Sequence, residues 1–151
     1  MSRTTVAALL LMAIGAWAQF GRVIPETTAK IDRPSESLVA SVAPIQTILA
    51  GQKEDGRTIA TFYLSLADVV ARDQGRVIRS AADLREVNRR AGALMFQQTG
   101  MTGKYPALAT AIEKVLADVV GLENTLLDDS RRTKAVEAFR AIAWAAGGGH
   151  A

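Results

Sequence analysis

Histidine, the residue that most often carries acid–base or metal chemistry, occurs once, as His150 in a glycine-rich stretch beside the last residue. Cysteine does not occur at all. A catalytic triad, a histidine metal site or an axial haem ligand needs an imidazole that its surroundings hold rigidly, and this stretch predicts none. The lack of cysteine also excludes thiolate metal sites and disulfides. We therefore expect neither a metal nor a cofactor, and no catalytic role for His150.

The segment GMTGK at residues 100–104 invites comparison with a phosphate-binding loop. Such a loop needs glycine five residues before Gly103, where this chain has Gln98, and serine or threonine at the position of Tyr105. It also follows a strand, whereas a helix is predicted here. We interpret the segment as a helix end followed by a tight turn. Lys104 is kept as a candidate contact for a small anion at the start of the next helix.

Basic side chains are densest just before and within a predicted helix. The cluster consists of Arg76, Arg79, Arg85, Arg89 and Arg90. Such a cluster is typical of a solvated helix face, and contact of Arg85, Arg89 and Arg90 with an anionic partner is the alternative. Nucleic acid is not expected, because the net charge is only +3 and loss of Arg3 with a signal peptide leaves 17 basic against 15 acidic residues.

Two pairs of adjacent carboxylates, Glu54 with Asp55 and Asp128 with Asp129, are the candidates for acid–base catalysis. A glycosidase needs two carboxylates that face each other across a cleft. Adjacent acids in turns more often cap helices, as Asp128 or Asp129 is expected to do. A cell-wall hydrolase with a carboxylate pair is kept as an alternative, but no residue is assigned a catalytic role. The aromatic side chains fall on apolar faces, where we expect core positions rather than a ligand cage.

Residues 1–18 carry the three parts of a secretory signal peptide in order. Arg3 supplies the positive charge, an apolar run follows, and Ala16 and Ala18 form the A-x-A cleavage pattern, which would leave Gln19 as the mature N-terminus. The apolar run is shorter than the ~20 residues that a membrane-spanning helix requires. We therefore favour cleavage over an uncleaved membrane anchor, and both over a terminal helix that packs on the core of a cytosolic protein.

The elements that must position the remaining groups are all helices. Apolar residues recur every three to four positions in five segments, and no segment alternates as a strand does. The predicted helices cover residues 35–50, 57–73, 80–97, 106–120 and 128–146. Pro44 should kink or break the first helix, residues 52–56 should form a charged turn, and Ser80 with Asp83 resembles a capping box.

A chain of 151 residues is long enough for one domain with its own core. Aromatic residues make up 5% of it, so Ala, Val, Leu and Ile must build that core. We predict an all-α bundle of four to five amphipathic helices at residues 35–147. A linker or arm at residues 19–34 should precede the bundle, and a flexible tail at residues 148–151 should follow it.

Three segments resemble a family of short hypothetical helical proteins in bacterial and phage genomes. These are RSAADLR at residues 79–85, GKYP at residues 103–106 and AIAWA at residues 141–145. The resemblance covers most of the predicted domain. It implies no activity, and no functional residue can be carried over.

We expect an exported protein, periplasmic or secreted, that acts by binding or assembly in the cell envelope or in a phage-related context. Its partner, a protein or another envelope component, is not identified by the sequence, and neither is its oligomeric state. A membrane-tethered form with an uncleaved N-terminus, which would contact the membrane through residues 1–18, is the first alternative. The carboxylate hydrolase is the second.

Overall fold

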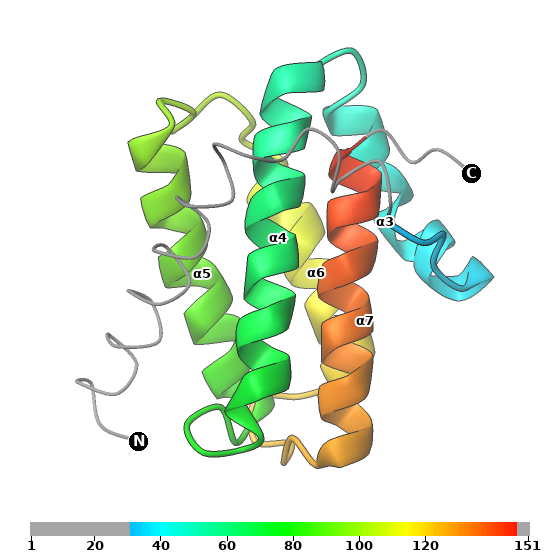
Figure 1. Cartoon of the computed structure of the whole chain (residues 1–151), viewed down its shortest axis with the longest axis vertical. Helices are drawn as coiled ribbons and strands as arrows, with labels where there is room; N and C mark the ends of the chain where they lie inside the picture. Colours follow the sequence, from blue (N-terminus) through cyan, green and yellow to red (C-terminus); the bar gives the residue numbers. More distant parts are fainter. Residues whose placement is uncertain (1–30, 148–151) are drawn as a thin grey trace.

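Five α-helices make up the part of the chain that the computed structural model describes, residues 31–147 (Figure 1). They are α3 (Glu36–Ile48), α4 (Lys53–Asp73), α5 (Ala81–Gln98), α6 (Leu108–Val120) and α7 (Asp129–Ala146). These residues contain no strand, and one isolated bridge joins Ser80 to Leu126. The predicted all-α bundle is confirmed. The cleavage residues Ala16 and Ala18 and the tail with His150 lie outside the described residues.

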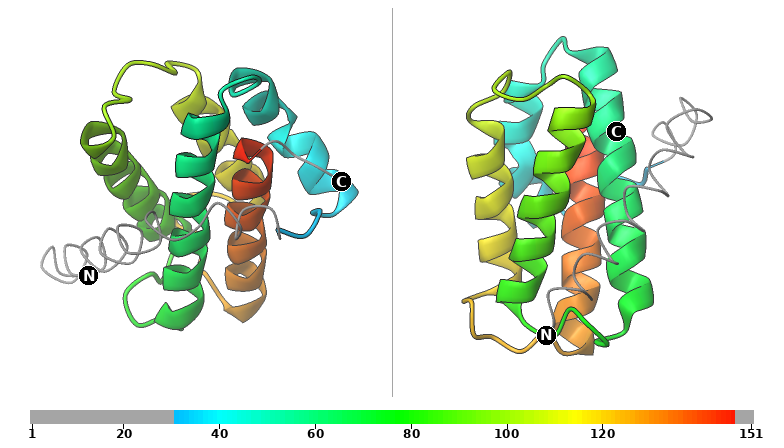
Figure 2. Two further views of the ribbon diagram at one scale, coloured as in Figure 1. Left: turned by 45° about the horizontal axis from the view of Figure 1, so that its top comes forward. Right: turned by 90° about the vertical axis from the view of Figure 1, so that its left-hand side faces the viewer.

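Helices α4 to α7 form a four-helix bundle, and α3 packs on its outside against α6 and α7. Seen from the side of α5, α4 and α6 flank that helix and α7 lies behind it (Figure 2). The α4–α7 pair makes the most extensive helix contact, whereas α5 contacts α6 more sparsely. The bundle therefore has a densely packed side at α4 and α7 and a looser side at α5 and α6.

The predicted caps start two helices. The hydroxyl of Ser80 accepts a hydrogen bond from the backbone N–H of Asp83, and the carboxylate of Asp83 accepts one from the backbone N–H of Ser80. Asp128 accepts from the backbone N–H of Arg131 at 2.8 Å and caps α7. Each bond satisfies a donor that the helix start leaves without an intrahelical partner.

The structure corrects three predicted boundaries. Helix α3 continues through Pro44 as one helix, so the predicted break into two pieces is wrong. Helix α4 starts at Lys53, so residues 52–56 are not a charged turn. The acids Glu54 and Asp55 thus fall in the first helical turn, where their negative charges interact favourably with the positive end of the helix dipole. Helix α6 starts at Leu108 rather than at Pro106.

Small residues let α4 and α7 approach closely. A Cβ atom added at Gly56 of α4 would overlap the backbone carbonyl oxygen of Ala146 of α7. The buried alanines on these two helices are Ala60, Ala67, Ala135, Ala138, Ala141, Ala143, Ala145 and Ala146. The alanines of the core are therefore found mainly on these two helices.

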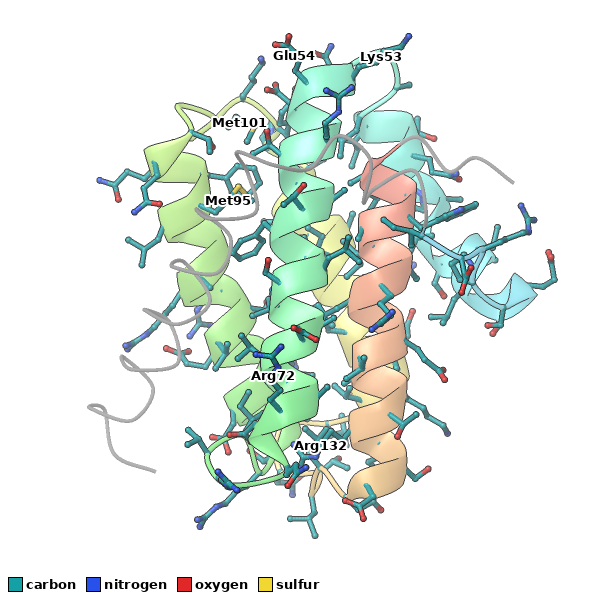
Figure 3. The ribbon with its side chains drawn as sticks, in the orientation of Figure 1. Lys53, Glu54, Arg72, Met95, Met101 and Arg132 are labelled. Atoms are coloured by element: carbon teal, nitrogen blue, oxygen red, sulfur yellow. The ribbon has the colours of Figure 1, made fainter. Side chains whose placement is uncertain are left out.

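A buried ion pair holds the far end of this side together. Arg132 donates hydrogen bonds to the carbonyl oxygens of Ile78 (3.2 Å) and Leu127 (2.9 Å). Its guanidinium lies 3.7 Å from the carboxylate of Asp73, which accepts from the backbone N–H of Ile78. Figure 3 shows Arg132 at the end of the bundle opposite Lys53 and Glu54. Two connections and the ends of α4 and α7 are thereby joined by one guanidinium.

Candidate functional site

A cavity of about 620 Å³ lies between α5 and α6. Its walls include Gly92, Ala93 and Phe96 of α5, and Ala109, Ile112 and Glu113 of α6. The connection between the two helices covers one end, through Met101 and Tyr105. The cavity is reached from solvent, since Ala93 and Ala109 are exposed. This looser side of the bundle therefore presents a hollow with mostly apolar walls.

The hollow arises from small side chains on facing helices. Gly92 and Ala93 leave space on α5, and Ala109 leaves space on α6. A Cβ added at Gly92 would meet only the hydroxyl of Tyr63, at 3.8 Å, which is ordinary van der Waals contact. The helix does not need glycine here for close packing, so the missing side chain serves to widen the cavity.

A connected polar cluster forms one wall of the cavity. The hydroxyl of Tyr63 donates to Asn88 Oδ1 at 2.9 Å, and Asn88 Nδ2 donates to Glu113 Oε1 at 3.4 Å. Arg85 Nε donates to Glu113 Oε2 at 3.1 Å. An ionised carboxylate only accepts hydrogen bonds, so the amide nitrogen of Asn88 has to face Glu113. One chain of contacts thus joins α4, α5 and α6.

The deepest member of this cluster is Tyr63, which is buried beneath the cavity between Phe62 and Phe139. Burial raises the pKa of its phenol well above the ordinary value, and the negative charge of Glu113 raises it further. The phenol therefore stays protonated and keeps donating to Asn88. The cluster has a fixed donor at its base and a carboxylate, about one third exposed, toward solvent.

The connection at residues 99–107 is held to the start of α4 by a latch of three side chains. Lys104 Nζ lies 2.7 Å from Asp55 Oδ2, and the hydroxyl of Tyr105 donates to the same oxygen. These hydrogen bonds, that of Lys104 first, hold the pKa of Asp55 below its ordinary value. Lys104, the candidate anion contact, is thus already paired with a carboxylate.

The predicted helix end and tight turn are found in this connection. The backbone N–H of Met101 donates to the carbonyl of Phe96 at 2.8 Å, and that of Lys104 donates to the carbonyl of Met101 at 3.0 Å. Gly100 and Gly103 take positive φ angles of 71° and 77°. Met101 is buried near Met95 at the end of the cavity (Figure 3).

The structure separates the three arginines that the sequence groups together. Arg85 turns toward α6 and pairs with Glu113. Arg89 and Arg90 both pair with Glu86, the latter at 2.6 Å, and their side chains are at least half exposed. Arg89 also reaches the rim of the cavity. Only Arg85 of the three belongs to the polar cluster.

The predicted acid pairs serve helix starts and the latch. Asp128 caps α7, Asp129 and Glu54 occupy first turns, and Asp55 holds Lys104. Among the described residues that line the cavity, Glu113 is the one acid. In residues 31–147 no three His, Asp or Glu side chains gather as a metal site would require.

Sequence reasoning named Arg85 of the polar cluster but missed Asn88 and Glu113. Asn88 lies on the same helical face as Leu84, Ala91 and Met95, all of them buried, and Glu113 follows the buried Ile112. A polar residue within an apolar stripe is a signal that could have indicated them. Phe62, Phe139 and Trp144 are core residues as predicted, whereas Tyr63 and Phe96 also reach the cavity.

No family model, curated protein or solved structure matches this chain. Among the helices of residues 31–147, none combines the length and the apolar character that crossing a membrane requires. The geometry of the cavity therefore carries the functional argument.

Proposed function

We propose that this protein is an exported helical bundle that works by binding, and that its ligand is a small, largely apolar molecule held in the α5–α6 cavity. The observation that carries the proposal is the cavity itself. Its volume of about 620 Å³ falls within the ~300–1,000 Å³ of small-molecule sites. Apolar walls with a few polar groups on one side are the usual composition of such sites.

The polar cluster supports binding rather than catalysis. Glu113 already accepts hydrogen bonds from Arg85 and Asn88, one at each of its carboxylate oxygens. A hydrolase with a carboxylate pair needs a second acid that faces the first across the cleft. The described lining supplies no second acid, so we do not favour that alternative.

Binding of an uncharged fluorescent probe tests the binding proposal. N-phenyl-1-naphthylamine should bind the full chain with a rise in fluorescence. Ala93→Phe should fill the cavity and weaken binding by about tenfold or more, which equals ~1.4 kcal/mol. Ala71→Phe, at an exposed position of α4 away from the cavity lining, is the matched control. Equal affinity in the two variants, or no binding to the unmodified chain, would overturn the proposal.

Export rests on the signal-peptide pattern of residues 1–18, and intact mass from the native host tests it. A mass that starts at Gln19 in a soluble envelope or secreted fraction is the expected result. A mass that includes Met1 in the membrane fraction would replace export with the tethered alternative. A mass that includes Met1 in the cytosol would overturn both.

A further inference from the structure

Hydrogen-bonding capacity is left over where the polar cluster meets the cavity. A carboxylate has about four lone-pair positions, and Glu113 accepts two hydrogen bonds from described residues. The amide nitrogen of Asn88 has two N–H groups and uses one of them on Glu113. Both residues line the cavity, and Asn88 is buried. A ligand group that both donates and accepts would complete both residues.

The charges of the polar cluster indicate whether the ligand group beside it is charged or neutral. Arg85 and Glu113 are each about one third exposed and form an internally neutral pair. An ionic ligand would find no unpaired opposite charge here, because Arg85 and Glu113 neutralise each other. Arg89 on the rim is already paired with Glu86. Transfer of a charged group from water into the cavity is costly when no opposite charge pairs with it there. A neutral ligand group therefore fits best beside Asn88 and Glu113.

The rest of the cavity offers apolar surface to the body of the ligand. Phe96 and Met101 lie toward the covered end, and Ile112 with Pro106 adds apolar wall from the α6 side. Met101 is almost fully buried there. Burial of an alkyl chain against these side chains is favourable, because it removes apolar surface from water.

We infer that the cavity selects an uncharged amphipathic molecule, an apolar chain or ring system with one hydroxyl or amide group placed against Asn88 and Glu113. The inference rests on the proposed binding function and specifies its ligand. Arg85 acts in it as a specificity residue, because it cancels the charge of Glu113 without filling the cavity.

Three ligands with the same alkyl chain test this inference: dodecan-1-ol, dodecanoate and dodecylammonium. Their affinities for the full chain are measured by displacement of N-phenyl-1-naphthylamine. The two ions are kept below their critical micelle concentrations and the alcohol below its solubility limit. The alcohol should bind tighter than either ion by about tenfold. Equal affinities, or tighter binding of either ion, would overturn the inference.

Two charge variants sharpen the test. Glu113→Gln leaves Arg85 without its partner, so dodecanoate should gain about tenfold. Arg85→Gln leaves Glu113 alone, so dodecylammonium should gain by the same factor. Arg72→Gln, at an exposed arginine of α4, is the control and should change neither ranking. If the relative affinities of the three ligands are unchanged in both Glu113→Gln and Arg85→Gln, the role assigned to the pair is wrong.

The two proposals fail in different ways. If the naphthylamine probe binds and Ala93→Phe weakens it, but the alcohol is not preferred, only the ligand class is wrong. If neither the probe nor any of the three ligands binds, the proposed binding function is wrong as well.

Discussion

The two long sides of the bundle use the same residue type in opposite ways. On the dense side, Gly56 of α4 lies so close to Ala146 of α7 that any side chain would overlap its carbonyl. On the loose side, a Cβ at Gly92 of α5 would make only an ordinary contact with Tyr63. A glycine within a helix can thus either close an interface or widen a cavity, and the facing helix decides which.

Polar groups differ between the two sides as well. Arg132 on the dense side is buried and donates to two backbone carbonyls beside Asp73, so its role is to hold connections together. On the loose side, Asn88 and Glu113 keep unused hydrogen-bonding positions beside a cavity. The first arrangement stabilises the fold, and the second is available to a ligand.

Removal of the buried guanidinium should give the largest effect. Arg132→Met leaves the carboxylate of Asp73 buried without its cation, and we expect a loss of about 3–5 kcal/mol in the free energy of unfolding. Urea denaturation followed by circular dichroism measures it. Arg140→Met, at an exposed position of the same helix, should change stability little. Similar losses of unfolding free energy in both variants would show that the dense side does not depend on the buried ion pair of Arg132 and Asp73.

Substitution of the two helix glycines, Gly56 and Gly92, should give the next largest effect. Gly56→Ala should destabilise the fold by about 1–3 kcal/mol, because α4 and α7 must move apart. Gly92→Ala should leave stability unchanged or raise it by up to ~1 kcal/mol, since alanine favours the helix and the space is free. Thermal unfolding of the two variants compares them directly. Equal destabilisation would remove the distinction between the two sides.

Disruption of the base of the polar cluster should have an effect on stability of similar size to Gly56→Ala. Tyr63→Phe leaves Asn88 Oδ1 buried without its donor, which should cost about 1–3 kcal/mol. Replacing both partners, as in Tyr63→Phe with Asn88→Leu, should cost less than the sum of the single changes. A strictly additive double-mutant cycle would mean that the two groups do not interact.

The latch at the end of the cavity should open at acidic pH. Because Lys104 and Tyr105 lower the folded-state pKa of Asp55, its stabilising contribution is present above the unfolded value of 3.8 and is lost as pH falls through the lowered pKa. Acid titration followed by the backbone amide signals of residues 99–107 should show a transition below pH 3.8. Asp55→Asn should abolish it, and an unchanged transition there would assign it to another group.

The latch should also weaken in alkali. Asp55 raises the pKa of Lys104 above its ordinary 10.5, chiefly by hydrogen bonding. The pKa of Tyr105 is raised above 10.0, first by burial and then by its bond to Asp55. Both contributions are present below these ordinary values and are lost as pH rises through the raised ones. The same amide signals should report this second transition.

Local sequence signals predicted most of the helices. Each helix has its own apolar stripe, and the caps at Ser80 and Asp128 lie next to the turns they start. The start of α4 could not be predicted in this way, because Gly56 is tolerated there for its contact with a helix far along the chain. Helix propensity alone disfavours glycine at such a position.

The cavity could not be predicted from local patterns either. Asn88 and Glu113 belong to different helices, and only the packing of α5 against α6 brings them to 3.4 Å. Asp55 and Lys104 are similarly distant in sequence and form the latch only once the fold is complete. The arginine cluster was visible in the sequence, but the pairing of Arg85 with Glu113 depends on the tertiary structure.

The most direct test of the central claim, that the looser side of the bundle binds an uncharged amphipathic ligand, is a methyl nuclear Overhauser experiment on the full chain with dodecan-1-ol. Met101 lines the covered end of the cavity, so its methyl group should show contacts with alkyl protons of the ligand, and Ala93→Phe should abolish them. Saturating binding without any contact at Met101 would contradict the account.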